Sequence, residues 1–487
     1  MKKILKEQPL HLLLLLIYFF IYAFGMYYPY VDMVGILKQN WIVFSTLFFL
    51  SILAILVSSS WSKLGIMLFP AFVLVLFFGS IVDSLKLLPF SAYFMHYSLL
   101  LPLFACCLGG IACFFYKWKS AYRMNYFFNM LTLLWWASSG IYFTMKSFSG
   151  MNESMYSPSN SLTLNHPSVN EKPDVYFIVM DGYPSSSVLL HRFGYVNALD
   201  SFLNKNNFYM VKESSSSYKN TCFSILSTLN MLPPDIRFNP NEVSNLEYLR
   251  CLRNIKSNNV CKFLEEQGYE IYNFSIFDLL QKKPATTPAF SFLYTQMTDN
   301  IMLPNRLLRD IRHIEHSKNK NDKIAPALME DYLQAVKDNQ MNDKEAEKAI
   351  AGKNPKFVYL HLLVPHETMV IDSFENAMMS EVNVFNAKFI NQLEYGNGLV
   401  VNYVNKILQH NPNSIIILQG DHGIRDFLGI TADDEFRNLH AYYFPDKNYE
   451  LLNDSLQNIN TFRVVFNTYF QQTLPLINNF RVNLKEQ

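Results

Sequence analysis

The sequence predicts a bundle of five transmembrane helices followed by an extracytoplasmic α/β domain with a largely parallel central sheet. Apolar residues are concentrated in the first 145 positions, whereas charged residues crowd the rest of the chain. The later part alternates short strand-like runs with helical patterns, which is typical of a parallel sheet covered by helices. We therefore expect a transmembrane domain at 1–146, a linker at 147–173 and the α/β domain at 174–487.

The composition excludes some classes of protein. The chain has 487 residues, which is too many for one ordinary core and indicates two or three units. Half of it is hydrophobic and only 17% is charged, which is apolar for a soluble enzyme. A formal charge of +1 gives no indication of a nucleic acid or of a strongly acidic partner.

Five segments are long enough to cross a bilayer, which takes about 20 apolar residues. None of them contains Lys, Arg, Asp or Glu. The first could instead be a cleavable signal peptide, but four further spans and the lack of a small-residue cleavage site favour an uncleaved anchor. The five expected spans are Leu10–Tyr27, Trp41–Ser62, Leu64–Val82, Tyr93–Tyr116 and Met124–Met145.

Basic residues orient the predicted bundle. If the spans alternate, one side carries Lys2, Lys3, Lys6, Lys63, Lys117, Lys119 and Arg123. The opposite loops hold only Lys38 and Lys86, with Lys146 after the last span. By the positive-inside rule the N-terminus is cytoplasmic, and five crossings of the cytoplasmic membrane place everything after Met145 outside the cytoplasm.

The external part reads as an α/β domain after a Ser-, Asn- and Pro-rich linker. Four helical patterns are expected. One lies at 195–206, a second begins at residue 221, a third ends near residue 268, and a fourth lies at 384–410. Residues 317–356 are expected to form solvated helices and loops that contribute no catalytic or metal-binding residue. The expected strands are 174–180, 208–211, 270–275, 357–363, 414–418 and 441–444.

Polar side chains that can bind metals or transfer protons adjoin several of these strands. In open α/β sheets, sites gather where loops leave the carboxyl ends of the strands. One acid after a strand is often only a cap or turn former, but four polar clusters around one sheet indicate a site. The residues at these positions are Asp181, His366, Asp421, His422, Arg425 and His440.

Thr221 begins a predicted helix, where backbone N–H groups and the helix dipole favour a phosphate or an oxyanion. Taken alone it is better explained as an ordinary N-cap, and Asn220 fits that position equally well. A threonine hydroxyl is unreactive at neutral pH, so a nucleophilic threonine needs a group that holds its alkoxide. A divalent metal on Asp181, Asp421 and His422 could do this.

The chain resembles the alkaline phosphatase superfamily in the order of its motifs: Asp181-Gly-Tyr, Thr221 opening a helix, His366, and then Asp421-His422-Gly. More closely it resembles the sulfatase-like membrane branch, which includes lipoteichoic acid synthases and lipid A phosphoethanolamine transferases. Those enzymes also place a five-helix membrane domain before an extracytoplasmic catalytic domain. The resemblance covers nearly the whole chain and implies an alkaline phosphatase/sulfatase-like fold for the α/β domain.

The resemblance implies a role for each matching residue. Asp181 corresponds to the first metal-binding acid, which is often Glu in the transferases. Thr221 corresponds to the nucleophile, which also touches the metal, while Asp421 and His422 correspond to the paired metal ligands. The implied cofactor is one divalent metal, and these ligand types favour manganese or zinc over magnesium.

Two histidines and one arginine complete the expected site. His366 and His440 resemble the histidines that handle the leaving group or the substrate. Arg425 has no counterpart, although an arginine here could clamp a phosphate. His361, His366 and His440 are candidate ligands of a second metal, but without a clear aspartate partner one metal fits the sequence better than two. His361 is better explained as a strand residue beneath the site.

The function implied by the resemblance is that of a membrane phosphotransferase. It would move a phospho-headgroup from a membrane phospholipid, a phosphodiester, to an envelope glycan or lipid through a phosphothreonine intermediate. Phosphoethanolamine and glycerol phosphate both remain open as headgroups, and water could replace the acceptor. Nothing in the sequence indicates the oligomeric state.

Two alternatives fit the sequence less well. A formylglycine sulfatase carries Cys-x-Pro-x-Arg, but Cys222 is followed by Phe-Ser-Ile-Leu, so the proline and arginine are missing. A sulfatase-like hydrolase of phospho- or sulfo-esters that lacks this motif remains open. A non-catalytic membrane scaffold or sensor would not need the intact set of Asp, Thr and Asp-His.

The cysteines indicate less. Those of the fourth span, at 106, 107 and 113, are expected to pack among its neighbours. Cys251 and Cys261 could form a disulfide in an oxidising compartment, although spacing alone does not show it. Cys222 is expected in the core, on the face of its helix.

Overall fold

The computed structural model divides into two compact units, one formed by Met1–Met155 with Phe292–Ile314 and the other by Tyr156–Ser291 with Glu315–Gln487. We call them the helical unit and the α/β unit. The structure describes residues 2–27, 37, 40–57, 63–86, 96–117, 121–152, 162–166, 171–234, 243, 245–280, 282, 301–308, 345–353, 355–365, 382–425 and 429–484.

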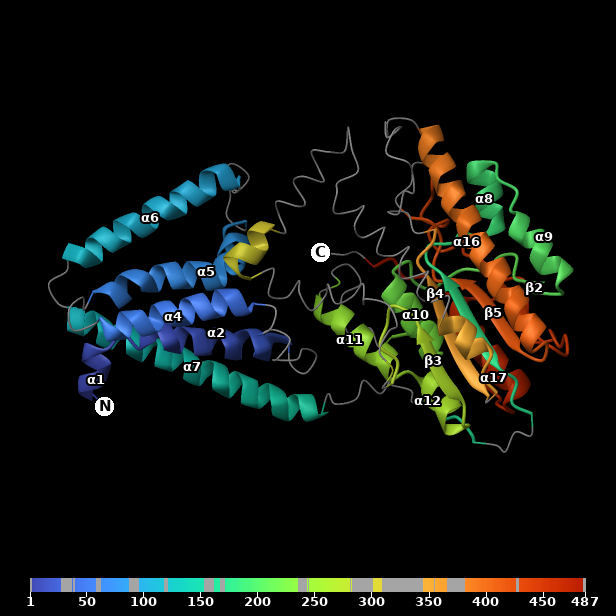
Figure 1. Ribbon diagram of the computed structural model, residues 1–487, viewed down its shortest axis with the longest axis horizontal. Coiled ribbons are helices and arrows are strands. Elements are labelled where there is room, and N and C mark those ends of the chain that lie inside the picture. The colour runs from blue at the N-terminus through green and yellow to red at the C-terminus, as the bar shows by residue number, and fades with distance from the viewer. Residues whose placement is uncertain are drawn as a thin grey trace. The chain divides into compact units, whose positions relative to one another are not determined.

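A helix lies at each of the five predicted spans of the helical unit (Figure 1). The helices are α1 Lys2–Glu7, α2 His11–Tyr27, α4 Trp41–Leu56, α5 Leu64–Lys86, α6 Tyr97–Lys117 and α7 Ala121–Asn152. Among the described residues, α5 and α6 are long and apolar enough to cross a membrane, whereas α4 and the apolar part of α2 are shorter. By length and composition two described helices therefore qualify as membrane spans, and five spans stay a prediction.

Residues 301–308 belong to the helical unit, although they lie far beyond its predicted boundary at residue 146. Met302 is fully buried in a core shared with α2, α4 and α5. The Gly79 N–H donates to Ile301 O at 2.9 Å. Arg306 binds Asp83, at the end of α5, through both of its terminal nitrogens at 3.2 and 2.8 Å. The chain thus returns to the helices in the middle of the expected α/β domain, because apolar side chains and a buried arginine find partners there.

The α/β unit is built on one six-stranded sheet of order β2-β6-β5-β1-β4-β3. The four strands from β5 to β3 are parallel, β6 is antiparallel to β5, and β2 is antiparallel to β6. The largely parallel sheet is confirmed, and each predicted strand is present. The strands are β1 Val175–Met180, β2 Tyr209–Met210, β3 Glu270–Phe274, β4 Lys356–Leu362, β5 Ile415–Gly420 and β6 His440–Tyr443.

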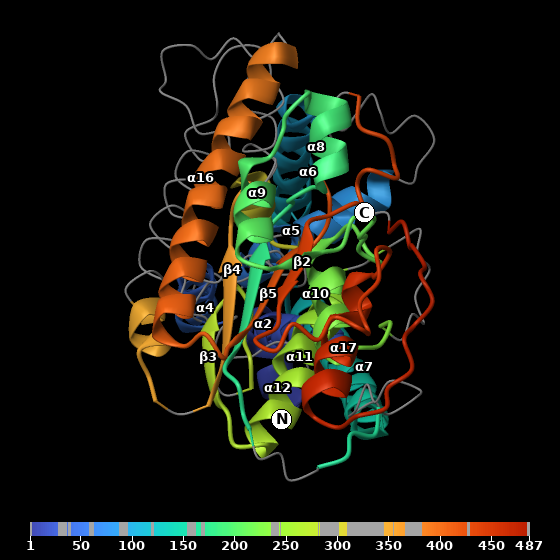
Figure 2. The same cartoon turned by 90° about the vertical axis from the view of Figure 1, so that its right-hand side faces the viewer.

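Helices cover both faces of this sheet. They are α8 Ser186–Phe193, α9 Ala198–Lys205, α10 Thr221–Asn230, α11 Asn245–Lys256, α12 Asn259–Glu266, α16 Val382–His410 and α17 Thr461–Tyr469, with a 3₁₀ turn at Asn458–Asn460. One face carries α8, α9 and α16, and the other carries α10, α11, α12 and α17 (Figure 1, Figure 2). Successive residues of β1 point to opposite faces of the sheet. Phe177 therefore packs in the core on the α10 side, and Ile178 packs in the core on the α16 side.

Two segments predicted as exposed connections contribute to these cores. Leu164, within the expected linker 147–173, packs against the core that contains α10. Ile350, within the expected solvated region 317–356, is 4% exposed and belongs to the opposite core. Ile350 packs together with Ala346 and Ala349, at helical spacing, and Leu164 packs together with Leu162. These apolar patterns are short and lie among many polar residues, so they do not stand out in the sequence.

Candidate metal centre

The register of three parallel strands brings two carboxylates together. Strand β1 lies between β4 and β5, and Met180 pairs with Gly420. The next residues, Asp181 and Asp421, therefore leave neighbouring strands side by side. Their exposed fractions are 4% and 0%. Two buried carboxylates this close repel one another unless a proton or a cation lies between them.

Asp421 is fixed through one oxygen and leaves the other for a ligand. Its Oδ1 accepts hydrogen bonds from the N–H groups of Gly182 and His422, each at 2.9 Å. Gly182 has a φ of 67°, in the left-handed region that favours glycine. Among the described residues, the buried Oδ2 has no hydrogen-bond partner. A buried carboxylate oxygen without a donor fits a position that a cation fills.

His422 is oriented in the same way. Its Nδ1 lies 2.6 Å from Gly423 O, so Nδ1 carries the proton and donates it to that carbonyl. The lone pair on Nε2 then faces the cluster, 3.4 Å from Asp421 Oδ2 and 3.7 Å from Asp181 Oδ1. A neutral imidazole held by a backbone carbonyl on one nitrogen is the usual form of a histidine ligand.

His361 joins this cluster, although the sequence interpretation kept it out of the ligand set. It lies in β4 as expected, opposite Val179 of β1. Its Nε2 is 3.8 Å from Asp181 Oδ2, and its Nδ1 is 2.9 Å from Tyr359 Oη. Within the described part of the chain, Nε2 has no hydrogen-bond partner. A polar residue in an otherwise apolar buried strand was the available signal.

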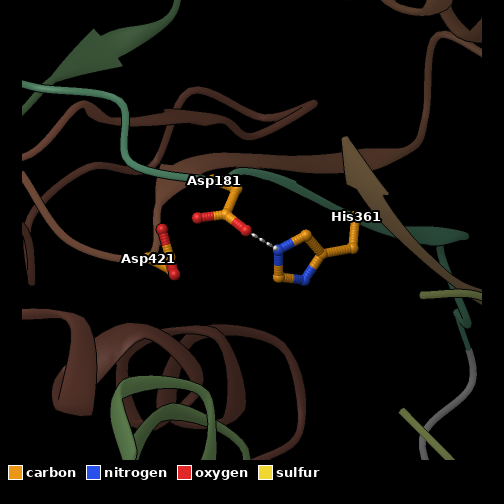
Figure 3. Close-up of side chains that lie close together, drawn as sticks. All are labelled: Asp181, His361 and Asp421. Atoms are coloured by element: carbon orange, nitrogen blue, oxygen red, sulfur yellow. Dashed lines mark ion pairs between the residues drawn. The ribbon is translucent and has the colours of Figure 1, made fainter. Parts of the chain in front are cut away.

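Asp181, His361 and Asp421 form a compact ligand group. Their ligand atoms all lie within 4.8 Å of one another. The Asp181 carboxylate lies between the other two side chains, with one oxygen toward His361 (Figure 3). Two carboxylates with imidazole nitrogens suit a divalent transition metal such as zinc or manganese.

The Thr221 hydroxyl reaches the same cluster. Asn220 occupies the N-cap of α10, with φ −98° and ψ 126°, so Thr221 is the first helical residue and the N-cap alternative for it is wrong. Its Oγ1 lies 3.3 Å from His422 Nε2. One turn later, Ser224 Oγ donates to Asp421 O at 2.5 Å, which fixes the start of α10 against the end of β5.

Arg425 contacts the loop that leads into α10. Its Nη1 donates to Lys219 O at 3.1 Å, two residues before Thr221. The Lys219 ammonium in turn pairs with Glu435 at 2.8 Å. These contacts stabilise the loop at the entrance to the helix, and the expected phosphate clamp by Arg425 stays a prediction.

His440 is held by two buried hydroxyls, which argues against the expected catalytic role. Its Nδ1 lies 3.2 Å from Ser214 Oγ, and its Nε2 lies 3.2 Å from Thr461 Oγ1. The side chain is buried, and this burial lowers its pKa from 6.5 to about 3. Both ring nitrogens are therefore occupied, and we assign His440 no step in the reaction.

His366, the other expected acid–base residue, lies outside the described residues. The described chain before it ends at Pro365, after β4. Its role stays a prediction from the sequence.

Comparison with protein-family models gives no match, and comparison with curated proteins gives none either. Solved structures do match, at low identity. The C-terminal periplasmic domain of EcEptC from Escherichia coli is 12% identical, with 63% of this chain and 84% of that chain covered and a TM-score of 0.38. The periplasmic domain of phosphoethanolamine transferase EptC from Campylobacter jejuni is 12% identical, with 66% and 97% covered and a TM-score of 0.38.

A sulfatase matches to the same degree. The 2-O GAG sulfatase BT1596 is 12% identical, with 63% of this chain and 72% of that chain covered and a TM-score of 0.38. Scores this far below 0.5 assign no function, so the interpretation of the centre rests on its own geometry.

Proposed function

We propose that this chain is a metal-dependent phosphotransferase of the alkaline phosphatase superfamily. It moves a phospho-headgroup from a lipid phosphodiester to an envelope glycan or lipid through a phosphothreonine intermediate. The observation that carries the proposal is the convergence of the Thr221 hydroxyl, the His422 lone pair and two buried carboxylates at the carboxyl edge of one sheet. The order of the sequence motifs supports the same assignment.

The proposed metal ligands are Asp181, Asp421 and His422, with the Thr221 oxygen as a further contact. We add His361 to this set because its Nε2 faces Asp181. When bound, a divalent cation neutralises charge on the nucleophile and on the phosphoryl oxygens. The two imidazoles favour zinc or manganese over magnesium. One of the matching solved structures is that of the EcEptC domain in complex with Zn.

The residues of the chain perform the transfer in two displacements. The Thr221 hydroxyl gives its proton to solvent water, its oxygen attacks the phosphorus in line, and the bond from phosphorus to the lipid alcohol breaks. The departing alcohol takes a proton, for which His366 is the proposed donor. The acceptor hydroxyl then gives its proton to His366 and its oxygen attacks the phosphorus. The bond from phosphorus to the Thr221 oxygen breaks, and that oxygen takes up a proton from water. The backbone N–H groups at the start of α10 stabilise the phosphoryl oxygens in both steps.

The position of Cys222 favours threonine chemistry over formylglycine chemistry. Its side chain is 1% exposed, and its sulfur lies against Cys251 rather than in the cluster. The neighbouring hydroxyl of Thr221 is the group that meets His422. A hydrolase that passes the phosphoryl group to water would use the same residues. An activity assay therefore has to distinguish water from a glycan or lipid acceptor.

We also propose that the chain is an integral membrane protein with its N-terminus in the cytoplasm and its α/β unit outside. The distribution of lysine and arginine supports this orientation. The lengths and hydropathies of α5 and α6 support insertion in a membrane.

Substitution of Thr221 tests the function. We expect Thr221→Ala to lower the transfer rate by about 10³-fold or more, because the nucleophile is removed while the metal ligands remain. The measurement combines transfer from labelled phospholipids, metal content by mass spectrometry, and a search for a headgroup adduct on residue 221. Thr221→Ser is the matched control and should keep measurable activity. Full activity in Thr221→Ala would refute the proposal.

A further inference from the structure

We propose that Cys222 and Cys251 form a disulfide that ties the helix bearing Thr221 to α11. No part of the proposed reaction uses this pair. The inference rests on the proposed extracytoplasmic location, because disulfides persist in oxidising compartments. It replaces the pairing of Cys251 with Cys261 that sequence spacing left open.

The two sulfur atoms already lie in contact. Cys222 Sγ and Cys251 Sγ are 2.6 Å apart, close to the length of about 2.05 Å that an S–S bond has. Both cysteines are buried, with exposed fractions of 1% and 2%. Their backbones are therefore close enough for a bond to form with little movement.

The surroundings hold the two helices in this arrangement. The rings of Phe223 and Tyr248 meet edge to face with centroids 5.2 Å apart. The Asn220 side chain donates to Tyr248 Oη at 3.3 Å. Residues on both sides of Cys222 thus contact the same turn of α11 that precedes Cys251.

Cys261 is the alternative partner, and its position is different. It lies in the first turn of α12, where its N–H donates to the N-cap side chain of Asn258 at 2.8 Å. It is fully buried. Of the three cysteines in the α/β unit, the structure places Cys222 and Cys251 against each other.

The bond forms by thiol–disulfide exchange. The two thiols lose two protons and two electrons, a sulfur–sulfur bond forms, and a disulfide donor of the thiol–disulfide oxidoreductase class is reduced to its dithiol. Burial raises the pKa of the Cys251 thiol, and the adjacent Cys222 sulfur raises it further. Because both sulfur atoms are buried, the finished bond is shielded from reductants.

The bond would position the nucleophile. Cys222 directly follows Thr221, so a link at its side chain restrains the first turn of α10 against α11. In the linked form the Thr221 hydroxyl keeps its place beside His422. Both cysteines are positioning residues, because neither touches the cluster.

Peptide mapping tests the bond directly. The full chain is taken from native membranes, denatured with an alkylating agent and no reductant, and digested. We expect a linked peptide containing residues 222 and 251, lighter by two hydrogen atoms than its separate thiol peptides, with Cys261 alkylated. Alkylation of both 222 and 251, or a linked peptide joining 251 to 261, would overturn the proposal. This readout does not depend on activity, so it can succeed or fail independently of the proposed transferase.

Variants test the positioning role. We expect Cys222→Ala/Cys251→Ala to lower kcat by about 10- to 100-fold with little change in KM, since small displacements of a nucleophile are costly. Its melting temperature should no longer respond to a reductant that can reach the unfolded chain, whereas that of the parent protein should fall. Cys261→Ser is the matched control and should retain both the linked peptide and the parent kcat. An unchanged kcat in a folded double variant would refute the positioning role.

Discussion

Three of the proposed ligand side chains, Asp421, His422 and His361, are each fixed through the atom that faces away from the centre. Asp421 uses one oxygen for two backbone N–H groups, and His422 uses Nδ1 for Gly423 O. His361 uses Nδ1 for the Tyr359 hydroxyl. The second polar atom of each side chain faces the centre, which is the arrangement expected of metal ligands. Asp421 and His422 could be identified from sequence because they follow a strand, whereas His361 lies within one.

The role of His361 can be tested at this scale. We expect His361→Gln to weaken binding of zinc or manganese by about 10- to 100-fold, because one nitrogen ligand beside Asp181 is lost. Titration of the metal-free protein with each ion gives the affinity. Tyr359→Phe is the control: it removes the hydrogen bond to Nδ1 and should have a smaller effect. Equal affinities in the parent and His361→Gln would exclude His361 as a ligand.

His440 makes a testable contribution to pH dependence. Burial lowers its pKa from 6.5 to about 3, so between these values the unfolded state takes up a proton that the folded state does not. The free energy of unfolding therefore falls as the pH drops below 6.5, by at most about 1.4 kcal/mol per pH unit from this residue. Urea unfolding followed by circular dichroism should show a shallower loss in His440→Asn than in the parent. Identical pH dependences would contradict this origin.

At the scale of elements, the end of β5 depends on close approach of a second segment. The Gly423 N–H donates to Glu435 O at 2.9 Å. A Cβ at residue 423 would lie 2.1 Å from Asp434 O and 2.6 Å from Arg437 O. The backbone of 434–437 therefore packs directly on the turn that carries Asp421 and His422. This contact explains why the second glycine of the Gly-Asp-His-Gly motif has no side chain. No pattern in the sequence predicted the contact.

This packing predicts a cost for one methyl group. We expect Gly423→Ala to lower the free energy of unfolding by about 1–3 kcal/mol or more, because backbone atoms must move to accept it. Metal affinity should fall as well, since the turn carries two ligands. Gly398→Ala in α16 is the control, because an added Cβ there meets no atom within 4 Å, and it should raise stability by up to about 1 kcal/mol. Thermal unfolding of both variants gives the comparison.

At the scale of the whole molecule, the chain does not complete one unit before it begins the other. Residues 301–308 return to the helical unit and bind it through Met302 and the Arg306–Asp83 pair. Asp83 lies just beyond the apolar stretch of α5, where a charged residue can meet an arginine without entering the hydrocarbon. The α/β unit is thus connected to the helices by more than the single linker that the sequence predicted.

The number of membrane crossings decides which side each terminus occupies. Five spans place the termini on opposite sides, whereas crossing by α5 and α6 alone places them on the same side. We expect an N-terminal epitope to be accessible only in inside-out vesicles and a C-terminal epitope only in right-side-out vesicles. Antibody binding to sealed vesicles of each kind measures this. Both epitopes on one side would exclude five spans.

The sequence alone determined much of the secondary structure and the order of the candidate site residues along the chain. Apolar runs, helical periodicity and turn residues are local properties, so the six strands, part of the helices and the polar residues after β1 and β5 could be read directly. The helices α8 and α17 were not predicted. Tertiary structure decided what meets what. Strand register set Asp181 beside Asp421, the packing of α10 turned Thr221 rather than Cys222 toward His422, and the approach of β4 brought in His361. These contacts join residues far apart in the chain, and only a folded sheet brings such residues within a few ångströms.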